Sequence, residues 1–422
     1  MKLRYARIAP IVVSVVLPLA AQAIGVGATA PSSSIVAPVA MALPDYLAVA
    51  HDPAFGTEFT RITKPGPLGG GVVCRDAYCS HRYSSSQAWN ADGSLLVLAN
   101  GCNGLCFLDG QTYRPLFRRA RATECEWHPV DPELMICVGG QSVSTWAPRA
   151  NREEPLFYST DYLRLQFGPY KGNPSLDGHR VAVRAKRKDG ALVVFAFDLA
   201  TRKKFPDIDL SQLPGTNNAC TISPLGGNIL CLQNTDEGID QAYVFTVDGV
   251  LTQRWTEHHR PGHGDMTVDG DGSEVYVGIS KSDPDKYQII KRRLSDGAVT
   301  SLMPYGEAQH VSLRAIQRPG WIIVSYAGDP AVVSRHPSWA PYAREVIALR
   351  LDGSGEVRRI AQTRNVPSDY WSETHASPSP DASQVIWTSN WNNPGGPAFE
   401  FVSRLDWPAE MGGADPVGEA VR

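Results

Sequence analysis

Three histidines lie in short polar segments, each just before an apolar run that predicts a β-strand. They are His263, followed by Asp265, then His310, and then His375, preceded by Glu373. The histidines are 47 and 65 residues apart. Imidazole and carboxylate groups bind divalent metals such as Mn²⁺ or Zn²⁺, and a neutral imidazole can abstract a proton near neutral pH. A single histidine beside a turn more often binds the backbone, so this chemistry requires a fold that brings the three together.

A second polar cluster precedes the first predicted strand. His81, Arg82 and Tyr83 are consecutive. An arginine can bind a carboxylate through two nitrogens at once, while the histidine and the tyrosine can transfer a proton. The alternative is a packed strand edge. We add three candidates for substrate binding: Tyr170, Asn173 and Arg314. Three tryptophans are either core residues or sugar-stacking platforms: Trp321, Trp387 and Trp391.

A repeated unit shows which elements must position these residues. The unit is a turn containing Pro, Asp or Gly, followed by a short strand rich in Val, Leu and Ile. Its seven copies begin at Trp89, Trp127, Pro174, Ser223, Val268, Gln317 and Ser379. Their spacing of roughly 40–60 residues is typical of propeller blades.

A second signal alternates with this repeated unit: a hairpin turn that follows an apolar strand. Asp- or Gly-bearing hairpin turns occur at 107–110, 197–199, 247–249, 294–297 and 351–353, and Asp-Gly between strands is a strong hairpin signal. The sequence therefore predicts an all-β fold, a single seven-bladed β-propeller of four-stranded antiparallel blades. The segment from Asp45 to Val73 is expected to supply the outer strand that closes the ring. Equivalent residues of successive blades converge on one mouth, so the three histidines can meet.

The N-terminal segment predicts export. Lys2, Arg4 and Arg7 precede an apolar run and a small-x-small site at 21–23, the pattern of a signal peptide. We expect residues 1–23 to be that peptide, 24–44 a flexible leader, 45–408 the propeller and 409–422 a loose tail. The expected location is periplasmic or secreted, with no membrane contact after cleavage.

The eight cysteines fall as four pairs of sequence neighbours, which reads as disulfides in an exported chain. Local pairing is expected, with Cys125–Cys137 and Cys220–Cys231 joining hairpin strands; the remaining four can also pair crosswise. The formal net charge of −3 argues against a partner bound through nucleic-acid phosphates. The hydrophobic content of 43% excludes global disorder.

The histidine segments resemble those of oligogalacturonate lyases, propellers that cleave uronic-acid oligosaccharides. The family carries a catalytic histidine, a metal-binding histidine about one blade later, and a histidine segment before a Ser-Pro-Asp turn. The matching positions are His263, His310 and His375, with the turn at 379–381. The family's last segment has a Gln and a second His as further ligands, where this chain offers Glu373. The segment 81–84 is also similar to ulvan lyases, although their second catalytic histidine has no counterpart near Gly101.

This resemblance implies β-elimination at a uronic acid. His263 would be the base, oriented by Asp265, and Tyr83 would protonate the leaving oxygen; His81 is a further catalytic candidate. A divalent metal, Mn²⁺ or Zn²⁺, would be held by His310, His375 and Glu373, and the partner would be an acidic oligo- or polysaccharide.

Two other functions stay open from the sequence. The first is a non-catalytic TolB-like propeller that binds a glycan or a protein. The second is a glycoside hydrolase with paired carboxylates, for which Glu124 and Glu126 are candidates. The oligomeric state is not predicted.

Overall fold

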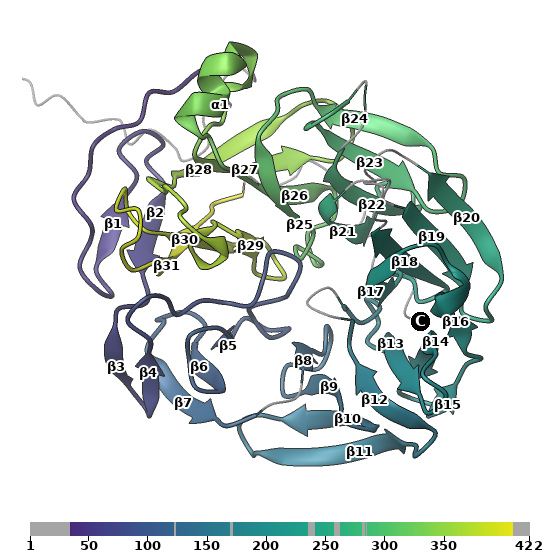
Figure 1. Cartoon of the computed structure of the whole chain (residues 1–422). Helices are drawn as coiled ribbons and strands as arrows, with labels where there is room; N and C mark the ends of the chain where they lie inside the picture. The colour runs from purple at the N-terminus through teal and green to yellow at the C-terminus, as the bar shows by residue number, and fades with distance from the viewer. Residues whose placement is uncertain are drawn as a thin grey trace, which may run out of the picture.

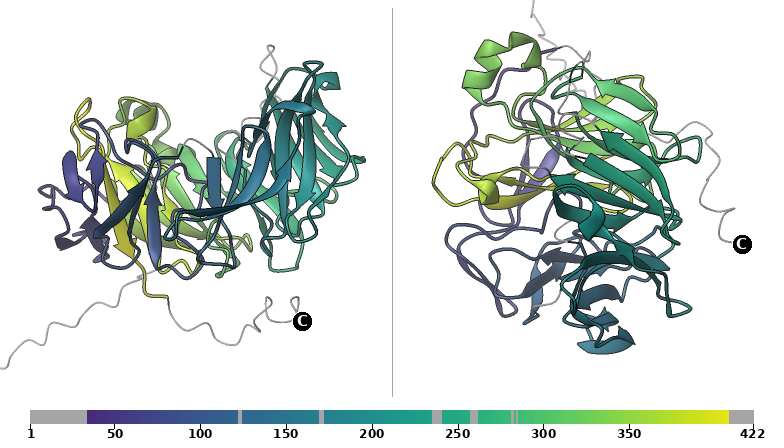
Figure 2. Two further views of the ribbon diagram at one scale, coloured as in Figure 1. Left: turned by 90° about the horizontal axis from the view of Figure 1, so that it is seen from below. Right: turned by 45° about the vertical axis from the view of Figure 1, so that its right-hand side comes forward.

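Seven antiparallel β-sheets are set radially around one axis in the computed structural model (Figure 1). The structure describes residues 34–121, 124–168, 172–234, 241–256, 262–280, 283 and 285–407. We number the sheets as blades 1–7. Over the described residues only one α-helix occurs, α1 (Pro330–Arg335), at the edge of the ring (Figure 2). The predicted seven-bladed propeller of four-stranded antiparallel blades is confirmed.

Blades 1 to 4 follow one another along the chain. Their strands are β5 (Leu95–Leu98), β6 (Leu105–Asp109) and β7 (Pro115–Arg119) in blade 1; β8 (Glu124–Trp127), β9 (Met135–Gly139), β10 (Ser142–Ala147) and β11 (Arg152–Tyr158) in blade 2; β12 (Tyr162–Gln166), β13 (Arg180–Arg187), β14 (Leu192–Asp198), β15 (Lys203–Lys204) and β16 (Ile208–Asp209) in blade 3; and β17 (Thr216–Ile222), β18 (Asn228–Asn234), β19 (Gln241–Thr246) and β20 (Leu251–Thr256) in blade 4. In blade 1 the innermost position is taken by a single bridge between Trp89 and Leu96.

Blades 5 to 7 complete the ring. Their strands are β21 (Gly262–Val268), β22 (Glu274–Ile279), β23 (Ile289–Arg293) and β24 (Val299–Met303) in blade 5; β25 (Ala308–Ser312), β26 (Trp321–Tyr326), β27 (Glu345–Arg350) and β28 (Val357–Gln362) in blade 6; and β29 (Ser377–Pro378), β30 (Gln384–Ser389), β31 (Phe399–Arg404), β2 (Glu58–Arg61) and β1 (Val49–His51) in blade 7. The other elements are the hairpin of β3 (Gly66–Gly69) and β4 (Val72–Cys74), and the 3-10 helices η1 (Leu210–Gln212), η2 (Pro337–Trp339) and η3 (Tyr370–Ser372).

The two repeated turns of the sequence occupy fixed places in a blade. The first joins the innermost strand to the second, as between β8 and β9, where the His128 amide donates to the Leu134 carbonyl. The Asp-Gly turn joins the third strand to the outermost, as after β6 and β19. In antiparallel blades both turns fall on one face of the ring. The longer connections, including 327–344 and 363–376, fall on the other.

Blade 7 combines the two ends of the described chain. Strand β2 pairs antiparallel with β31, with Phe59 opposite Ser403 and Arg61 opposite Phe401. The segment 45–73 therefore supplies the closing strand that the sequence suggested. Upstream, residues 34–44 lie against the same part of the ring: Gln362 binds the backbone of Ala37 and Val39 through its side-chain amide.

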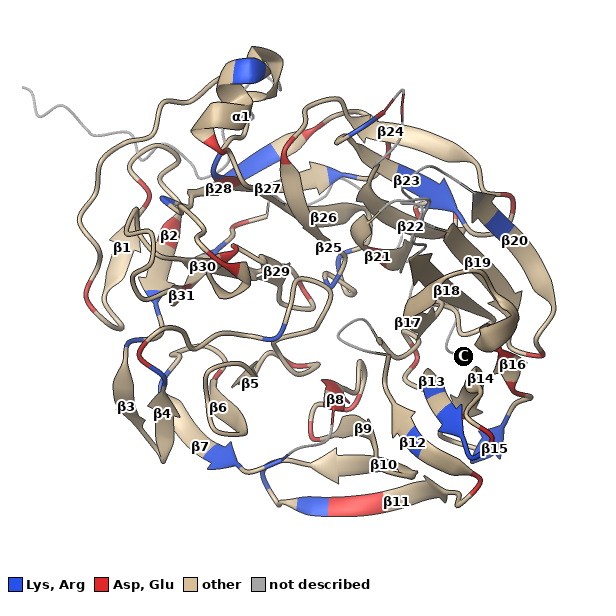
Figure 3. Cartoon of the chain, in the orientation of Figure 1, with Lys and Arg blue, Asp and Glu red and all other residues tan. Residues whose placement is uncertain are grey.

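Apolar residues of neighbouring blades pack face to face and form the core. Trp387 and Phe401 of blade 7 stack at 4.6 Å between ring centroids and share one core cluster with Trp321 of blade 6. Trp387 and Trp321 are 0% and 4% exposed. Both tryptophans are therefore core residues, and Trp391 packs on Phe401 beside them. Charged residues of both signs are spread around the ring (Figure 3).

Four disulfides join the sequence neighbours, as the local pairing predicted. They are Cys74–Cys79, Cys102–Cys106, Cys125–Cys137 and Cys220–Cys231. The last two link directly opposed residues of the two inner strands of blades 2 and 4. Four such bonds indicate an oxidising compartment. None of the described helices is both long and apolar enough to cross a membrane.

Candidate functional site

Three consecutive blades bring the histidines of the sequence analysis together. His263 lies on β21, His310 on β25 and His375 just before β29, strands that are neighbours around the centre of the ring (Figure 1). The rings of His263 and His310 are nearly parallel, with centroids 4.8 Å apart. The centroids of His310 and His375 are 4.3 Å apart. Residues from three separate blades thus form one cluster of imidazoles.

Local backbone irregularities orient the side chains of His263, His310 and His375. The register of β21 shifts between Gly262 and Asp265, and that of β25 shifts between Ala308 and His310. A bulge redirects a side chain and is common beside active sites. His263 and His375 also have positive φ angles of 52° and 43°, a region that non-glycine residues seldom adopt and that concentrates at functional sites.

His310, Glu373 and His375 form a group that can hold a metal ion. One ligand atom from each lies within 4.8 Å of those of the other two. The Glu373 carboxylate is 2.8 Å from His310 Nε2 and 3.3 Å from His375 Nε2. Two imidazoles and a carboxylate form a donor set suited to a divalent transition metal.

The protonation of this group fits a cation. Burial lowers the pKa of His310 well below its usual value, and burial also lowers that of His375. Although burial alone acts upward, the adjacent imidazoles of His310 and His375 lower the pKa of Glu373 to about 2. In the described part of the chain, His310 Nδ1 and His375 Nε2 are buried without a hydrogen bond of good geometry. Neutral imidazoles with unsatisfied nitrogens beside a carboxylate are ready to bind a metal.

His263 is oriented by the main chain of the neighbouring blade. Its Nδ1 lies 2.7 Å from the carbonyl oxygen of Gln309. A carbonyl oxygen only accepts, so Nδ1 carries a proton, and in the neutral form of the ring the lone pair is on Nε2. The expected partner, Asp265, binds Arg314 at 2.7 Å and the amide of Met266 at 2.8 Å. Burial raises the pKa of Asp265.

His81 uses both ring nitrogens within the protein. Nδ1 lies 3.0 Å from the Glu400 carboxylate, and Nε2 lies 2.7 Å from the backbone carbonyl of His375. Burial alone would lower the pKa of His81, but the adjacent Glu400 raises it above its usual value. This geometry is that of a support for the His375 backbone.

Tyr83 lies against the metal-ligand group. Its ring is edge-on to His310 at 5.2 Å and tilted toward His375 at 5.0 Å. Burial raises the pKa of Tyr83, with further contributions from Tyr370 and Glu373. The hydroxyl therefore stays protonated and can donate a hydrogen bond.

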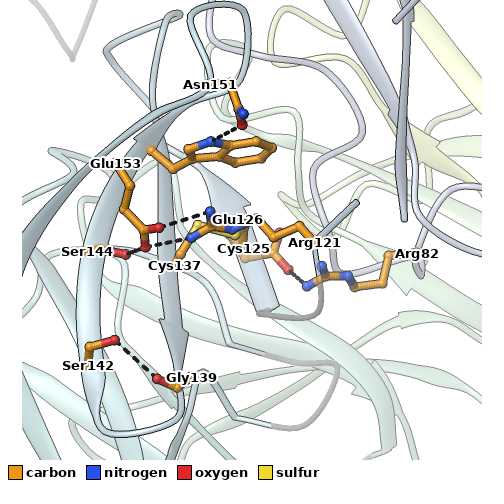
Figure 4. Close-up of a disulfide and its surroundings, with 11 residues drawn as sticks. Arg82, Arg121, Cys125, Glu126, Cys137, Gly139, Ser142, Ser144, Asn151 and Glu153 are labelled. Carbon is orange, nitrogen blue, oxygen red and sulfur yellow. Dashed lines mark hydrogen bonds and ion pairs between the residues drawn. A yellow bond between two sulfur atoms is a disulfide. The ribbon is translucent and has the colours of Figure 1, made fainter. Parts of the chain in front are cut away.

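The two candidate arginines differ in their hydrogen-bond partners and in the exposure of their side chains. Arg82 donates to Glu126 at 2.8 Å (Figure 4), and its side chain is 15% exposed. Arg314 donates to both Asp265 and the Met266 carbonyl, and its side chain is 7% exposed. Arg82 is therefore the more accessible of the two.

Asn173 belongs to the interior of the ring. Its side-chain amide donates to the Ser85 carbonyl at 2.9 Å and contacts Asp265 at 3.3 Å. Tyr170 lies outside the described residues.

The sequence analysis missed three contributors to this site. Glu400 carries no motif, because it is one residue of β31, an ordinary strand in the middle of blade 7. Gln309 acts through its carbonyl, which no side-chain pattern reveals. Tyr370 lies with its ring centroid 5.0 Å from that of His375; its only signal is its position three residues before Glu373.

Comparisons with known proteins place the fold. No family model matches the sequence, and no curated protein matches it either. The structure is similar to that of an oligogalacturonate lyase in complex with manganese, with a TM-score of 0.59 and 16% sequence identity. The match covers 85% of this chain and 96% of that one. At this identity the likeness concerns the propeller fold, and it agrees with the resemblance found in the histidine segments.

Proposed function

We propose that the protein is a lyase that cleaves acidic oligosaccharides by β-elimination at a uronic acid, with His263 as general base. The observation that carries this proposal is the 4.8 Å stacking of His263 on His310. It sets an imidazole whose Nδ1 faces the Gln309 carbonyl directly beside the His310–Glu373–His375 group. A proton acceptor next to a cation site is what removal of a proton α to a carboxylate requires.

The reaction needs one proton acceptor and one hydrogen-bond donor. Nε2 of His263 takes the C5 proton of the uronate, the C4–C5 double bond forms, and the C4–O bond breaks. Tyr83 donates to the leaving oxygen, which takes up a proton. Arg82 binds the uronate carboxylate beside its own partner, Glu126.

A divalent cation, Mn²⁺ or Zn²⁺, would be held by His310, Glu373 and His375. Such an ion would stabilise the negative charge that develops on the uronate carboxylate as the C5 proton leaves. Arg314 and Asn173 both contact Asp265 in the interior, and we assign these three residues to holding the strands that carry the site. We place the protein in the periplasm or outside the cell, in keeping with its disulfides.

The test is turnover of defined polyuronides. Wild-type protein with added Mn²⁺ is incubated with oligogalacturonate, ulvan, alginate and glucuronan, and unsaturated products are followed by their ultraviolet absorbance. We expect one of them to be cleaved and His263→Ala to abolish cleavage. His179→Ala, which alters a histidine with a 60% exposed side chain, is the matched control. Full activity of His263→Ala, or no cleavage of any of the four, contradicts the proposal. New reducing ends without unsaturated products would indicate a hydrolase.

A further inference from the structure

Two aromatic residues next to the candidate metal site are exposed. Tyr370 and Trp371 are 45% and 39% exposed, whereas Trp321 and Trp387 are core residues. Trp371 stacks on Tyr78 with 4.7 Å between centroids and an interplanar angle of 1°. Tyr370 stands edge-on to Trp371 at 5.2 Å. We call Tyr78, Tyr370 and Trp371 the aromatic shelf.

The shelf is held in place from both sides. Tyr370 and Trp371 belong to η3, whose capping box joins Asp369 and Ser372, and the side chain of Asn365 binds the Ser372 carbonyl at 2.6 Å. On the other side, Tyr78 is next to the Cys74–Cys79 disulfide and forms a bridge with Ala398. Leaving aromatic surface in water is unfavourable, and a fixed, exposed aromatic group is a common feature of binding sites.

The shelf is continuous with the site of the proposed reaction. The chain runs directly from Trp371 through Ser372 to Glu373 and then to His375. The Tyr370 ring lies 5.0 Å from His375 and is nearly parallel to Tyr83, 6.4 Å away. The exposed Tyr370 ring therefore lies within contact distance of both the metal-ligand group and Tyr83.

The geometry points to a sugar-stacking subsite on the aromatic shelf, next to the unit whose carboxylate reaches the metal-ligand group. This inference rests on the proposed function for the class of ligand. One face of a pyranose is a patch of C–H groups, which packs on the electron-rich face of an aromatic ring, while its hydroxyls stay in water. The shelf thus favours an oligosaccharide over a monosaccharide, because it holds the neighbouring sugar.

The test is calorimetric binding of trigalacturonate and of galacturonate, in the His263→Ala background so that no turnover occurs. The variants are Tyr370→Ala, Trp371→Ala and Trp371→Phe. Tyr158→Ala is the control, since Tyr158 is 65% exposed on outer strand β11. We expect the two alanine variants on the shelf to bind trigalacturonate about tenfold more weakly. Galacturonate binding stays unchanged, and Trp371→Phe and Tyr158→Ala stay close to the parent.

Three results overturn the subsite. They are wild-type affinity of both shelf alanine variants for trigalacturonate, equal losses for the trimer and the monomer, and no trigalacturonate binding by the parent. Dimerisation that disappears in Trp371→Ala while sugar binding is unchanged would instead assign the shelf to a second copy of the chain. Binding is measured without turnover, so the two proposals can fail separately. If the shelf binds trigalacturonate but the wild-type protein has no lyase activity, the proposed reaction is refuted and the subsite is retained.

Discussion

His81 donates the hydrogen of Nε2 to the backbone carbonyl of His375 at 2.7 Å. The other ring nitrogen binds Glu400, whose side chain is 0% exposed. This places a buried ionic pair directly behind one of the candidate metal ligands. We therefore propose that His81 positions His375, in place of the catalytic role considered from the sequence.

Removing His81 alone is expected to be costly. His81→Ala leaves the Glu400 carboxylate buried without its partner, which destabilises a protein by about 3–5 kcal/mol. Denaturant unfolding of His81→Ala, Glu400→Gln and the double variant measures this. We expect the double variant to be more stable than the sum of the single effects predicts. Strict additivity would show that the two side chains do not interact.

Metal binding should depend on the three proposed ligands. We expect elemental analysis to find about one Mn²⁺ or Zn²⁺ per chain after dialysis against the metal. Because each ligand contributes directly, Glu373→Gln and His310→Ala should lower the affinity by at least about tenfold. Chelation should remove the metal and any lyase activity together. Unchanged metal content in both variants would exclude this group, and His179→Ala again serves as control.

Tyr83→Phe separates the hydroxyl from the ring. The phenyl ring keeps the contacts with His310 and His375, so the melting temperature and metal content should stay near those of the wild type. Loss of a proton donor in the transition state should lower kcat by about 100-fold or more. A uronide with a more acidic leaving group should lose less, because it needs less proton donation. A wild-type kcat with either substrate would remove Tyr83 from the reaction.

Glu126 predicts a pH dependence of stability. Burial raises the pKa of Glu126 to about 7, although Arg82 acts in the opposite direction. Its unfolded pKa is lower, so the folded state binds the proton more tightly. The resulting stabilisation is complete below the unfolded pKa and is lost as pH rises through about 7. The melting temperature of the wild type should therefore fall over this window relative to Glu126→Gln. Parallel curves for the two proteins would contradict the prediction.

The sequence predicted the fold because its repeats mark regular geometry. Turns such as those at Trp89 and Trp127 link the inner strands on one face, where every blade needs the same short connection. Cys125 and Cys137 could be paired for the same reason, since the hairpin between them sets them directly opposite each other.

The candidate site was only partly predictable, because it lies on the irregular face. His263, His310 and His375 were found through their blade spacing, which fixes position around the ring. Orientation was not predictable: the bulges in β21 and β25 decide that His263 meets the Gln309 carbonyl and that Asp265 meets Arg314. Tyr370 and Trp371 were missed because η3 occurs in a connection without a repeat.

The ring is closed in blade 7, where β2 pairs with β31, and the same blade carries part of the candidate metal site. Strand β31 pairs with β2 from the beginning of the described chain, and the backbone of Glu400 on β31 binds both Ile62 and Thr63. Glu400 in turn supports His81 behind His375. Cleaving the chain after residue 63 would thus spare every proposed ligand and still damage their scaffold. Metal retention would therefore report whether the two ends of the chain are joined in blade 7.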